Sequence, residues 1–387
     1  MRGFKDNIPP VSRGIDYVQR VFQLCSDKFG CDMVDLPIVE DADLYFRTSG
    51  DASDVCNKEL FEVRRWKGDF EGWALRPEGT ASCMRAIKEA NFMQSARAAR
   101  FAYFGPMFRY NRPQKGRYRQ FLQAGWEFIG QKGAASDCEI ILGAVEFLRT
   151  FGFDFTLEIN SIGSAQDRRL YRAELAKMLS LDEGADPLKV LDKAENFDNI
   201  PKMKLNPEDA ADFEKLRYLL AKSGLEARGV KVVHNPYLVR GLDYYNSTVF
   251  ELKAVETGQT VLAGGRYDGL MEQIGGDFVP AVGFAAGVDR IVDHMGFVYD
   301  NKKVALIALD SHDYALKLAA KIRSEYDFGC VVYWNLDLAK ALRECDKQGY
   351  EWVVICGQNE ANSGQFLVKN LRTQNQEIRK FDLPFSL

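Results

Sequence analysis

Five cations are crowded into one short stretch of a chain that is acidic overall. The formal net charge of the 387 residues is -4, yet FRYNRPQKGRYRQF, residues 108–121, has no acidic residue. Its cations are Arg109, Arg112, Lys115, Arg117 and Arg119. A loop of this charge is suited to bind an anion such as a phosphate, but a solvated hairpin with surface ion pairs has the same composition. Spacing alone does not decide between these two interpretations.

The strand pattern that follows gathers polar side chains on one face. Alternate residues of a strand point to the same side of a sheet, so YRQFLQAGWEFIG brings together a cation, a ring, an amide and a carboxylate. They are Arg119, Phe121, Gln123 and Glu127. In the preceding strand, Arg109 and Asn111 share a face. Such a face is costly to bury unless its polar groups meet a ligand or each other. One interpretation is a floor that binds a planar ring on Phe121, phosphates on Arg109 and an ammonium on Glu127; the other is a solvated hairpin with surface ion pairs.

Three further motifs contain residues suited to ligand contact, and for the first two a purely structural role is the alternative. LAGGRYDGL contains Gly264 and Gly265, which either let the backbone approach a ligand or form a tight turn. VRGLDYYNSTVFE contains Tyr244 and Tyr245, which we predict on opposite faces of a strand; ordinary packing is the alternative. GFAAGVDRI places Arg290 early in a helix, where a buried guanidinium would need an anionic partner.

Composition and missing motifs argue against several kinds of protein. Apolar residues make up 46% and charged residues 27%, as in globular proteins, and there is no signal peptide or run of about 18 apolar residues to span a membrane. The eight cysteines form no CxxC pair and there are three histidines, which argues against structural zinc and favours reduced thiols in a cytosolic protein. The chain also lacks GxxxxGK[ST] and GxSxG motifs, so a Walker nucleotide loop and a serine hydrolase are not expected.

The predicted elements place these motifs on strands and at strand ends. Hydrophobic periodicity predicts helices over residues 13–29, 81–92 and 136–153. Residues 100–130 are predicted as a long antiparallel hairpin around the turn RPQKG, and a shorter hairpin ends at Pro77 to Thr80. Charged helical segments over about 165–228 predict an insertion between strands. From about residue 302, strands and helices alternate as in a small α/β domain.

Taken together and in order, five segments closely resemble the histidyl-tRNA synthetases. They are LRPEGT (75–80), FGPMFRYNRPQKGRYRQF (104–121), LVRGLDYYNSTVFE (238–251), LAGGRYDGL (262–270) and GFAAGVDRI (283–291). The signatures ending at Pro37, around Arg109 and at Arg290 are similar to those of all class II synthetases, whereas RGLDYY and GGRYDG resemble the histidine-specific pair. The resemblance covers essentially the whole chain.

The resemblance implies an α+β fold in two domains. Residues 1–300 would form the class II catalytic domain, an antiparallel sheet with flanking helices and the helical insertion at about 165–228. Residues 302–387 would form the C-terminal α/β anticodon-binding domain. It further implies a cytoplasmic homodimer, with the helix and strand before Pro37 at the interface, that activates histidine with ATP and Mg²⁺ and passes the histidyl group to tRNA(His).

The resemblance also implies roles for individual residues. Histidine would be bound by Glu78, Gly79, Thr80, Gln123, Glu127, Tyr244, Tyr245 and Tyr267. ATP would be bound by Arg109, Asn111, Arg117, Arg119, Phe121 and Arg290. Catalysis would depend on Arg240, which would stabilise charge on the α-phosphate, together with Arg109 and Arg290. Gln114 would meet the acceptor end of the tRNA, and no metal site made of protein ligands alone is implied.

Three residues depart from the family pattern. Asn111 stands where the family has a glutamate that contacts adenine, so a charge-assisted acceptor is replaced by an amide. Leu122 stands where a histidine is common, and Asp289 replaces a glutamate beside Arg290. Two alternatives to an active ligase therefore stay open: a non-catalytic relative similar to the regulatory subunit of ATP phosphoribosyltransferase, and a tRNA-binding protein that has lost activation.

Overall fold

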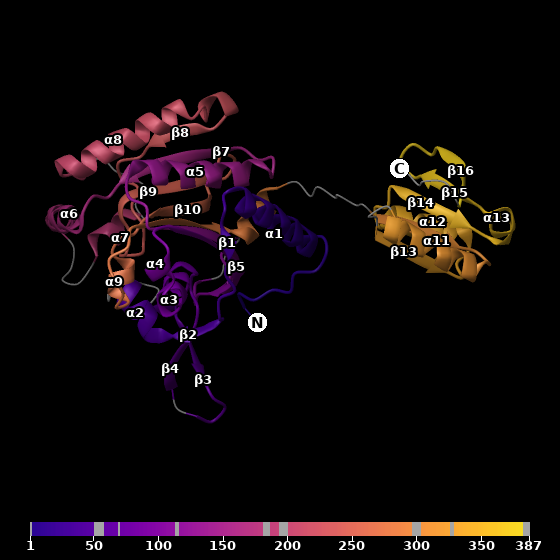
Figure 1. Ribbon diagram of the computed structural model, residues 1–387, viewed down its shortest axis with the longest axis horizontal. Coiled ribbons are helices and arrows are strands. Elements are labelled where there is room, and N and C mark those ends of the chain that lie inside the picture. Colours follow the sequence, from indigo (N-terminus) through magenta and orange to yellow (C-terminus); the bar gives the residue numbers. More distant parts are fainter. Residues whose placement is uncertain are drawn as a thin grey trace. The chain divides into compact units, whose positions relative to one another are not determined.

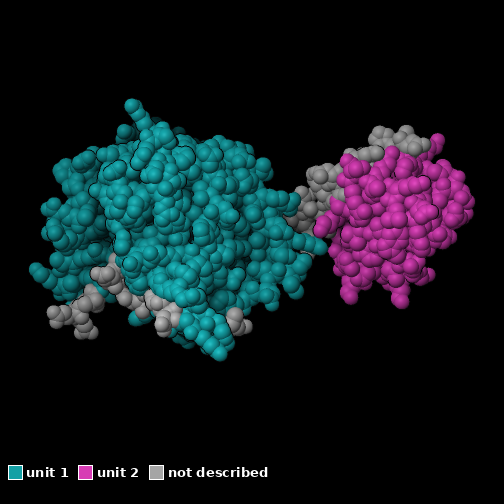
Figure 2. Space-filling model, turned by 60° about the horizontal axis from the view of Figure 1, so that its bottom comes forward, with its two compact units in different colours: residues 1–297 teal, residues 298–387 magenta. Residues whose placement is uncertain are grey.

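A computed structural model of the chain divides into two compact units, residues 1–297 and 298–387 (Figure 2). The structure describes residues 2–49, 58–68, 70–112, 116–180, 186–192, 200–295, 303–325 and 329–381. No helix within these residues is long and apolar enough to cross a membrane.

An eight-stranded sheet forms the centre of the first unit (Figure 1). Its strands, in spatial order, are β1 (Asp32–Met33), β5 (Ala99–Phe108), β6 (Gln120–Ile129), β11 (Ala281–Gly287), β10 (Thr260–Arg266), β9 (Asn246–Ala254), β7 (Phe155–Ser161) and β8 (Lys231–His234). Neighbours from β5 to β7 run antiparallel, whereas β1 and β8 pair in parallel at the two edges. The predicted antiparallel sheet with flanking helices is thus confirmed, with parallel strands added at its edges.

Helices cover both faces of this sheet, and each face has its own apolar core. On one face lie α1 (Val11–Lys28), α5 (Ala134–Arg149), α8 (Pro207–Lys222) and α10 (Val288–His294). On the other lie α2 (Ala42–Ser49), α3 (Thr80–Glu89), α6 (Ala165–Met178), α7 (Pro187–Asp192) and α9 (Leu270–Gln273). Figure 1 shows α8 above β9 and β10, and α2, α3 and α9 below them. The charged segments predicted as an insertion form α6, α7 and α8.

Alternation along β6 separates the two cores as the sequence predicts. Trp126 and Phe128 face the core under α1 and α5, where the Trp126 indole donates a 2.8 Å hydrogen bond to Ser26. Glu127 and Phe121 belong to the opposite face, which also carries Tyr103 of β5. This second face of the sheet also carries the predicted site residues Tyr244, Tyr245 and Tyr267.

A three-stranded sheet leads the chain into α3. Its order is β2 (Val39–Asp41), β4 (Phe70–Leu75) and β3 (Phe61–Arg64), all antiparallel. The β3–β4 hairpin ends just before Pro77, as predicted from its turn residues. A further short helix, α4 (Phe92–Ser95), joins α3 to β5.

Three details of the sequence interpretation are wrong. The strand before Pro37 has only two residues, Asp32–Met33. Tyr244 and Tyr245 precede β9 instead of alternating along a strand, and both rings are buried on the same side, 4.7 Å apart. Gly264 and Gly265 form no turn: they lie within β10, where a Cβ would come within 2.2 Å of the Gly283 carbonyl and 2.5 Å of the Thr248 carbonyl, respectively. These glycines therefore permit close packing inside the sheet.

The second unit is a five-stranded sheet with helices. Its strand order is β13 (Gly329–Trp334), β12 (Lys303–Ala308), β14 (Trp352–Cys356), β15 (Gln365–Asn370) and β16 (Gln376–Lys380), with helices α11 (His312–Glu325), α12 (Leu338–Lys347) and α13 (Gln358–Ser363). The first three strands are parallel and the last two antiparallel. The predicted alternation of strand and helix is present, and β16 is an addition to it.

Candidate active site

A buried hydrogen-bond network joins α3 to the central strands. The Thr80 hydroxyl, in the first turn of α3, donates a 2.7 Å hydrogen bond to Oε1 of Glu127, and the Tyr267 hydroxyl donates to Oε2. Burial raises the pKa of Glu127 to about 8, although both hydrogen bonds act in the opposite direction. The carboxyl group lies against Gly283 of β11, where a Cβ would come within 1.7 Å of Oε2. The site therefore depends on a glycine here.

A second buried carboxylate, Glu78, holds the start of α3. Its two oxygens accept the backbone N–H groups of Thr80 and Ala81 at 2.7 and 2.8 Å. These are two of the donors that a helix start leaves unpaired. Burial raises the pKa of Glu78, while the backbone hydrogen bonds and Arg109 oppose this rise. Two acidic groups beside each other in a buried site are suited to bind a cation such as an ammonium.

Three tyrosine rings wall this part of the site. The Tyr244 ring lies 4.7 Å from Tyr245 and 5.7 Å from Tyr267 between centroids. All three are buried. The Oε1 atom of Gln123 is buried nearby on β6 with no hydrogen-bond partner among the described residues. Aromatic walls with a free amide acceptor and two carboxylates suit a small polar molecule with a planar ring.

Arginines gather beside this pocket. Burial and the nearby charges of Arg117, Arg109 and Arg240 lower the pKa of Arg290 to about 10. The Arg290 guanidinium is held by the carbonyls of Gly116, at 3.1 Å, and Thr260, at 2.5 Å. Four like charges held close together favour an anion between them.

The arginines are fixed in different ways. Arg240 forms an ion pair with Glu251, which also accepts a 2.8 Å hydrogen bond from Thr260. Arg109 donates to the Pro77 carbonyl at 2.8 Å, and its guanidinium carbon lies 5.5 Å from the centre of the Phe121 ring. These contacts hold Arg109 beside Phe121, and its charge also acts on the pKa of Glu78.

Two predicted ATP contacts lie farther along the hairpin. Arg119 stacks on Tyr110, with its guanidinium carbon 3.7 Å from the ring centre, and donates to the carbonyls of Asn111 and Arg2 at 3.4 Å. Asn111 lies just after β5, where its backbone N–H bonds to the Arg109 carbonyl at 2.7 Å. Gln114, the predicted tRNA contact, lies outside the described residues.

Several residues that support the site were missed by sequence reasoning. The Tyr103 ring fills space left by Gly79 and Gly125, where a Cβ would come within 2.2 and 2.4 Å of it. Alternation along the strand alone could have placed Tyr103 on the same face as Arg109. Arg266 is buried and pairs with Asp137, a residue 129 positions away that no local pattern connects to it.

The insertion also contacts the tyrosine loop. Arg168 of α6 donates to the Tyr245 carbonyl, and Arg172 pairs with Asp243 at 2.7 Å and Asp186 at 3.3 Å. Because Tyr245 lies in no strand, these side chains supply contacts that a sheet would otherwise give. The sequence showed only a charged helical segment here.

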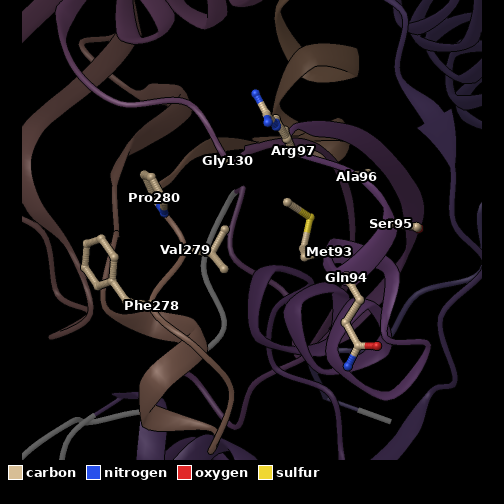
Figure 3. A pocket seen from close by; sticks show the side chains of 9 residues that line it. All are labelled: Met93, Gln94, Ser95, Ala96, Arg97, Gly130, Phe278, Val279 and Pro280. Atoms are coloured by element: carbon tan, nitrogen blue, oxygen red, sulfur yellow. The ribbon is translucent and has the colours of Figure 1, made fainter.

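We also looked for cavities and metal sites outside the cluster of Arg109, Arg117, Arg240 and Arg290. A cavity of about 430 Å³ lies between the Met93–Arg97 segment, Gly130 and the segment from Phe278 to Pro280, and none of its lining residues is a predicted site residue (Figure 3). Within the described residues, no three acidic, histidine or cysteine side chains cluster as metal ligands would. All seven cysteines in this part of the chain are free and buried.

Comparisons with known proteins agree with this arrangement. The histidyl-tRNA synthetase family model matches residues 3–167 and 156–291, and an anticodon-binding domain model matches residues 302–383. A histidine–tRNA ligase from Marinomonas sp. (strain MWYL1) is 36% identical over 99% of this chain and 96% of its own length.

Solved structures show the same likeness. The apo histidyl-tRNA synthetase of S. aureus is 26% identical, with a TM-score of 0.75 over 99% of this chain and 97% of that one. A Bacillus halodurans structure described as an ATP phosphoribosyltransferase regulatory subunit/histidyl-tRNA synthetase is 21% identical, with a TM-score of 0.68 over 92% of this chain and 97% of that one, and shows the shared fold. With a family model over most of its first unit and a full-length relative at 36% identity, the chain belongs to the histidyl-tRNA synthetase family.

Proposed function

We propose that the chain is a histidine–tRNA ligase. In the first step the histidine carboxylate attacks the α-phosphorus of ATP, the bond to the β-phosphate breaks, and histidyl-adenylate and pyrophosphate form. In the second, a hydroxyl of the terminal adenosine of tRNA(His) attacks the carbonyl carbon and AMP leaves. The observation that carries the proposal is that the arginine cluster borders the pocket of Glu78, Glu127 and the tyrosines. Arg109 is close enough to Glu78 to oppose the rise of its pKa, and Arg240 is close enough to Tyr245 to oppose the rise of its pKa.

In this proposal, the buried polar groups bind histidine. Its ammonium would contact Glu127, Thr80 and the Oε1 atom of Gln123, which has no other partner among the described residues. Glu78 would add negative charge while holding the helix start, and Gly79 would leave room for the Tyr103 ring. The imidazole would lie against Tyr244, Tyr245 and Tyr267; the Tyr267 ring meets each of the other two nearly edge to face.

ATP would lie along the hairpin, with adenine on Phe121 and Asn111. Arg109 would bind the α-phosphate, because its guanidinium lies beside Phe121 and its charge acts on Glu78 of the histidine pocket. Arg290 and Arg117 would contact the far phosphates. Arg119, which stacks on Tyr110, would act at the outer end of this site. Mg²⁺ would arrive with ATP as part of the substrate.

Arg240 would be the residue that favours the transition state. Attack by a carboxylate concentrates negative charge on the α-phosphate, where a fixed cation has most effect. The ion pair with Glu251 holds this guanidinium in place before ATP binds. Preorganisation of this kind lowers the cost of reorganising the site during reaction.

No feature of the site favours the alternative that the chain is a regulatory subunit of ATP phosphoribosyltransferase. The second unit is present and matches an anticodon-binding domain over residues 302–383, and the RGLDYY tyrosines form a closed wall with Tyr267. A tRNA-binding protein without activation is a weaker alternative for the same reason, since its histidine pocket would have no use.

We further propose a cytoplasmic homodimer whose interface includes the segment before Pro37. Met33 in that segment exposes an apolar side chain, as do Ile38 and Val39 directly after Pro37, and a partner subunit would cover them. Gln114 at the hairpin tip would meet the acceptor end of the tRNA. Sedimentation of the purified chain would test the dimer, which a monomer at micromolar concentration would contradict.

Charging of tRNA(His) tests the proposed function as a whole. With ATP and Mg²⁺, the folded chain should attach histidine to tRNA(His) and leave other tRNAs uncharged. Formation of histidyl-adenylate without transfer would support only the first step, and no histidine attachment to any tRNA would contradict the proposal.

A further inference from the structure

Residues 2–5, here called the strap, cross the hairpin next to the arginine cluster. The backbone N–H of Arg119 donates a 2.8 Å hydrogen bond to the Gly3 carbonyl, and its side chain reaches the Arg2 carbonyl at 3.4 Å. The Phe4 ring packs on Phe61 at 6.0 Å, and Phe61 on Tyr110 at 5.5 Å. The strap thus contacts Arg119, just before β6, directly, and it reaches Tyr110, just after β5, through Phe61 of β3.

Lys5 connects the strap to the helix that begins beside Arg290. Its Nζ lies 3.2 Å from Oδ1 of Asp289 and 4.0 Å from the centre of the Tyr118 ring. The other oxygen of Asp289 accepts the backbone N–H of Leu122 at 2.8 Å. Asp289 is 5% exposed, so its charge depends on these partners more than a surface charge would.

One carboxylate therefore joins three parts of the chain. It fixes α10, which carries Arg290, to the start of β6, which carries Phe121, and both to Lys5. The shorter aspartate at this position, one of the departures noted in the sequence, fits these contacts. Glutamate would add a methylene to a carboxylate that already bonds to Leu122 and Lys5.

We propose that Lys5 is a positioning residue for the nucleotide, acting through Asp289 on Arg290 and Phe121. This inference rests on the proposed function, because it takes these two residues as ATP contacts. Lys5 itself is not a catalytic residue. Loss of the Lys5 ammonium should leave the buried Asp289 carboxylate with one partner fewer. The residues on α10 and β6 should then bind ATP less tightly, whereas the histidine pocket should stay intact.

The test compares Lys5→Met, the conservative Lys5→Arg, and Lys222→Met. The last removes another lysine that lies over a ring, Tyr218, but on α8. Pyrophosphate exchange gives KM for ATP and for histidine separately, and equilibrium binding of MgATP tests the inference even if exchange fails. In Lys5→Met we expect the KM and Kd for ATP to rise roughly tenfold, as for loss of a hydrogen bond to a charged group. The KM for histidine should not change.

Lys5→Arg should restore most of the ATP affinity, and Lys222→Met should match the parent chain. Asp289→Asn keeps the shape but removes the charge, so it should weaken ATP binding by a similar factor, with little further loss in the double variant. Unchanged ATP affinity in Lys5→Met would overturn the inference, and so would equal losses for ATP and histidine, which would indicate general disruption. Absence of exchange in the parent chain, with ATP binding still sensitive to Lys5, would instead count against the proposed function.

Discussion

The Thr80 hydroxyl donates a 2.7 Å hydrogen bond to Oε1 of Glu127, although 47 positions separate the two residues. The start of α3 and the middle of β6 are thereby fixed around one buried carboxyl group. On the other side of that group, Tyr267 donates from a loop that follows β10. Three segments distant in the sequence thus converge on the atom pair where the histidine ammonium would bind.

Replacing Glu127 by glutamine should weaken histidine activation while preserving the fold. The amide has the same shape but cannot pair with an ammonium, so kcat/KM for histidine should fall roughly 10- to 100-fold. Pyrophosphate exchange at varied histidine measures this, with the KM for ATP as an internal control. A fall for ATP alone would contradict the assigned role of Glu127.

The pH dependence of stability should change in the same variant. In the folded chain without bound histidine, burial raises the pKa of Glu127 to about 8, whereas its ordinary value, which applies to the unfolded chain, is 4.5. Between these values the folded state binds more protons, so this group makes the free energy of unfolding fall as pH rises, by at most about 1.4 kcal/mol per pH unit.

As the pH rises from 5 to 8, the free energy of unfolding of Glu127→Gln should therefore increase relative to that of the parent, as measured by urea unfolding. Glu78, whose pKa burial also raises, keeps part of the pH dependence in the variant. A stability difference that is constant across this pH range would contradict the raised pKa of Glu127.

Gly283→Ala should damage the histidine pocket. The added methyl group would come within 1.7 Å of Oε2 of Glu127 and 2.7 Å of the Trp126 carbonyl, so the strand or the carboxyl group must move. We expect a loss of about 1–3 kcal/mol in stability and a raised KM for histidine. Gly269→Ala, whose Cβ would meet no atom within 4 Å, is the matched control. Equal behaviour of the two variants would count against this packing.

Arg240→Gln should lower the rate of activation far more than the affinity for histidine. Removal of one cation from the reacting phosphate is expected to reduce kcat roughly 10²- to 10³-fold. Lys253→Gln is a suitable control, because Lys253 also lies 3.5 Å from Glu251 but has no assigned contact with substrate. Comparable losses in kcat and in histidine binding would contradict the role given to Arg240.

Asn111→Glu should strengthen ATP binding. A carboxylate is a stronger acceptor for the adenine amino group than an amide, so the KM for ATP should fall several-fold. Asn111→Gln adds the same length without the charge and should have little effect. A KM for ATP that is unchanged or raised in Asn111→Glu would contradict a contact between position 111 and the adenine amino group.

Local patterns predicted much of this fold. The alternation in β6 separated Trp126 from Glu127 correctly, because a strand in a two-sided sheet must place successive residues in different cores. Turn chemistry around Pro77 and the periodicity of α5 were likewise sufficient. These features depend on neighbours in the sequence.

Long-range packing could not be predicted in this way. The two tyrosines before β9 belong to a segment whose pattern predicts a strand, whereas contacts from Arg168 and Arg172 of the insertion hold them in a loop. The glycine pair in β10 resembles a turn in the sequence. Glycine is needed there because of the Gly283 and Thr248 carbonyls, which lie on neighbouring strands and not nearby in the sequence. The strap was missed because nothing in its own sequence indicates Asp289.

Pyrophosphate exchange into ATP, run with each of the twenty amino acids separately, tests the central claim most directly. The account predicts exchange with histidine well above all others, because only histidine carries both the ammonium for Glu127 and an imidazole for the tyrosine wall. A folded chain that shows no exchange with histidine above background, or equal exchange with another amino acid, would contradict it.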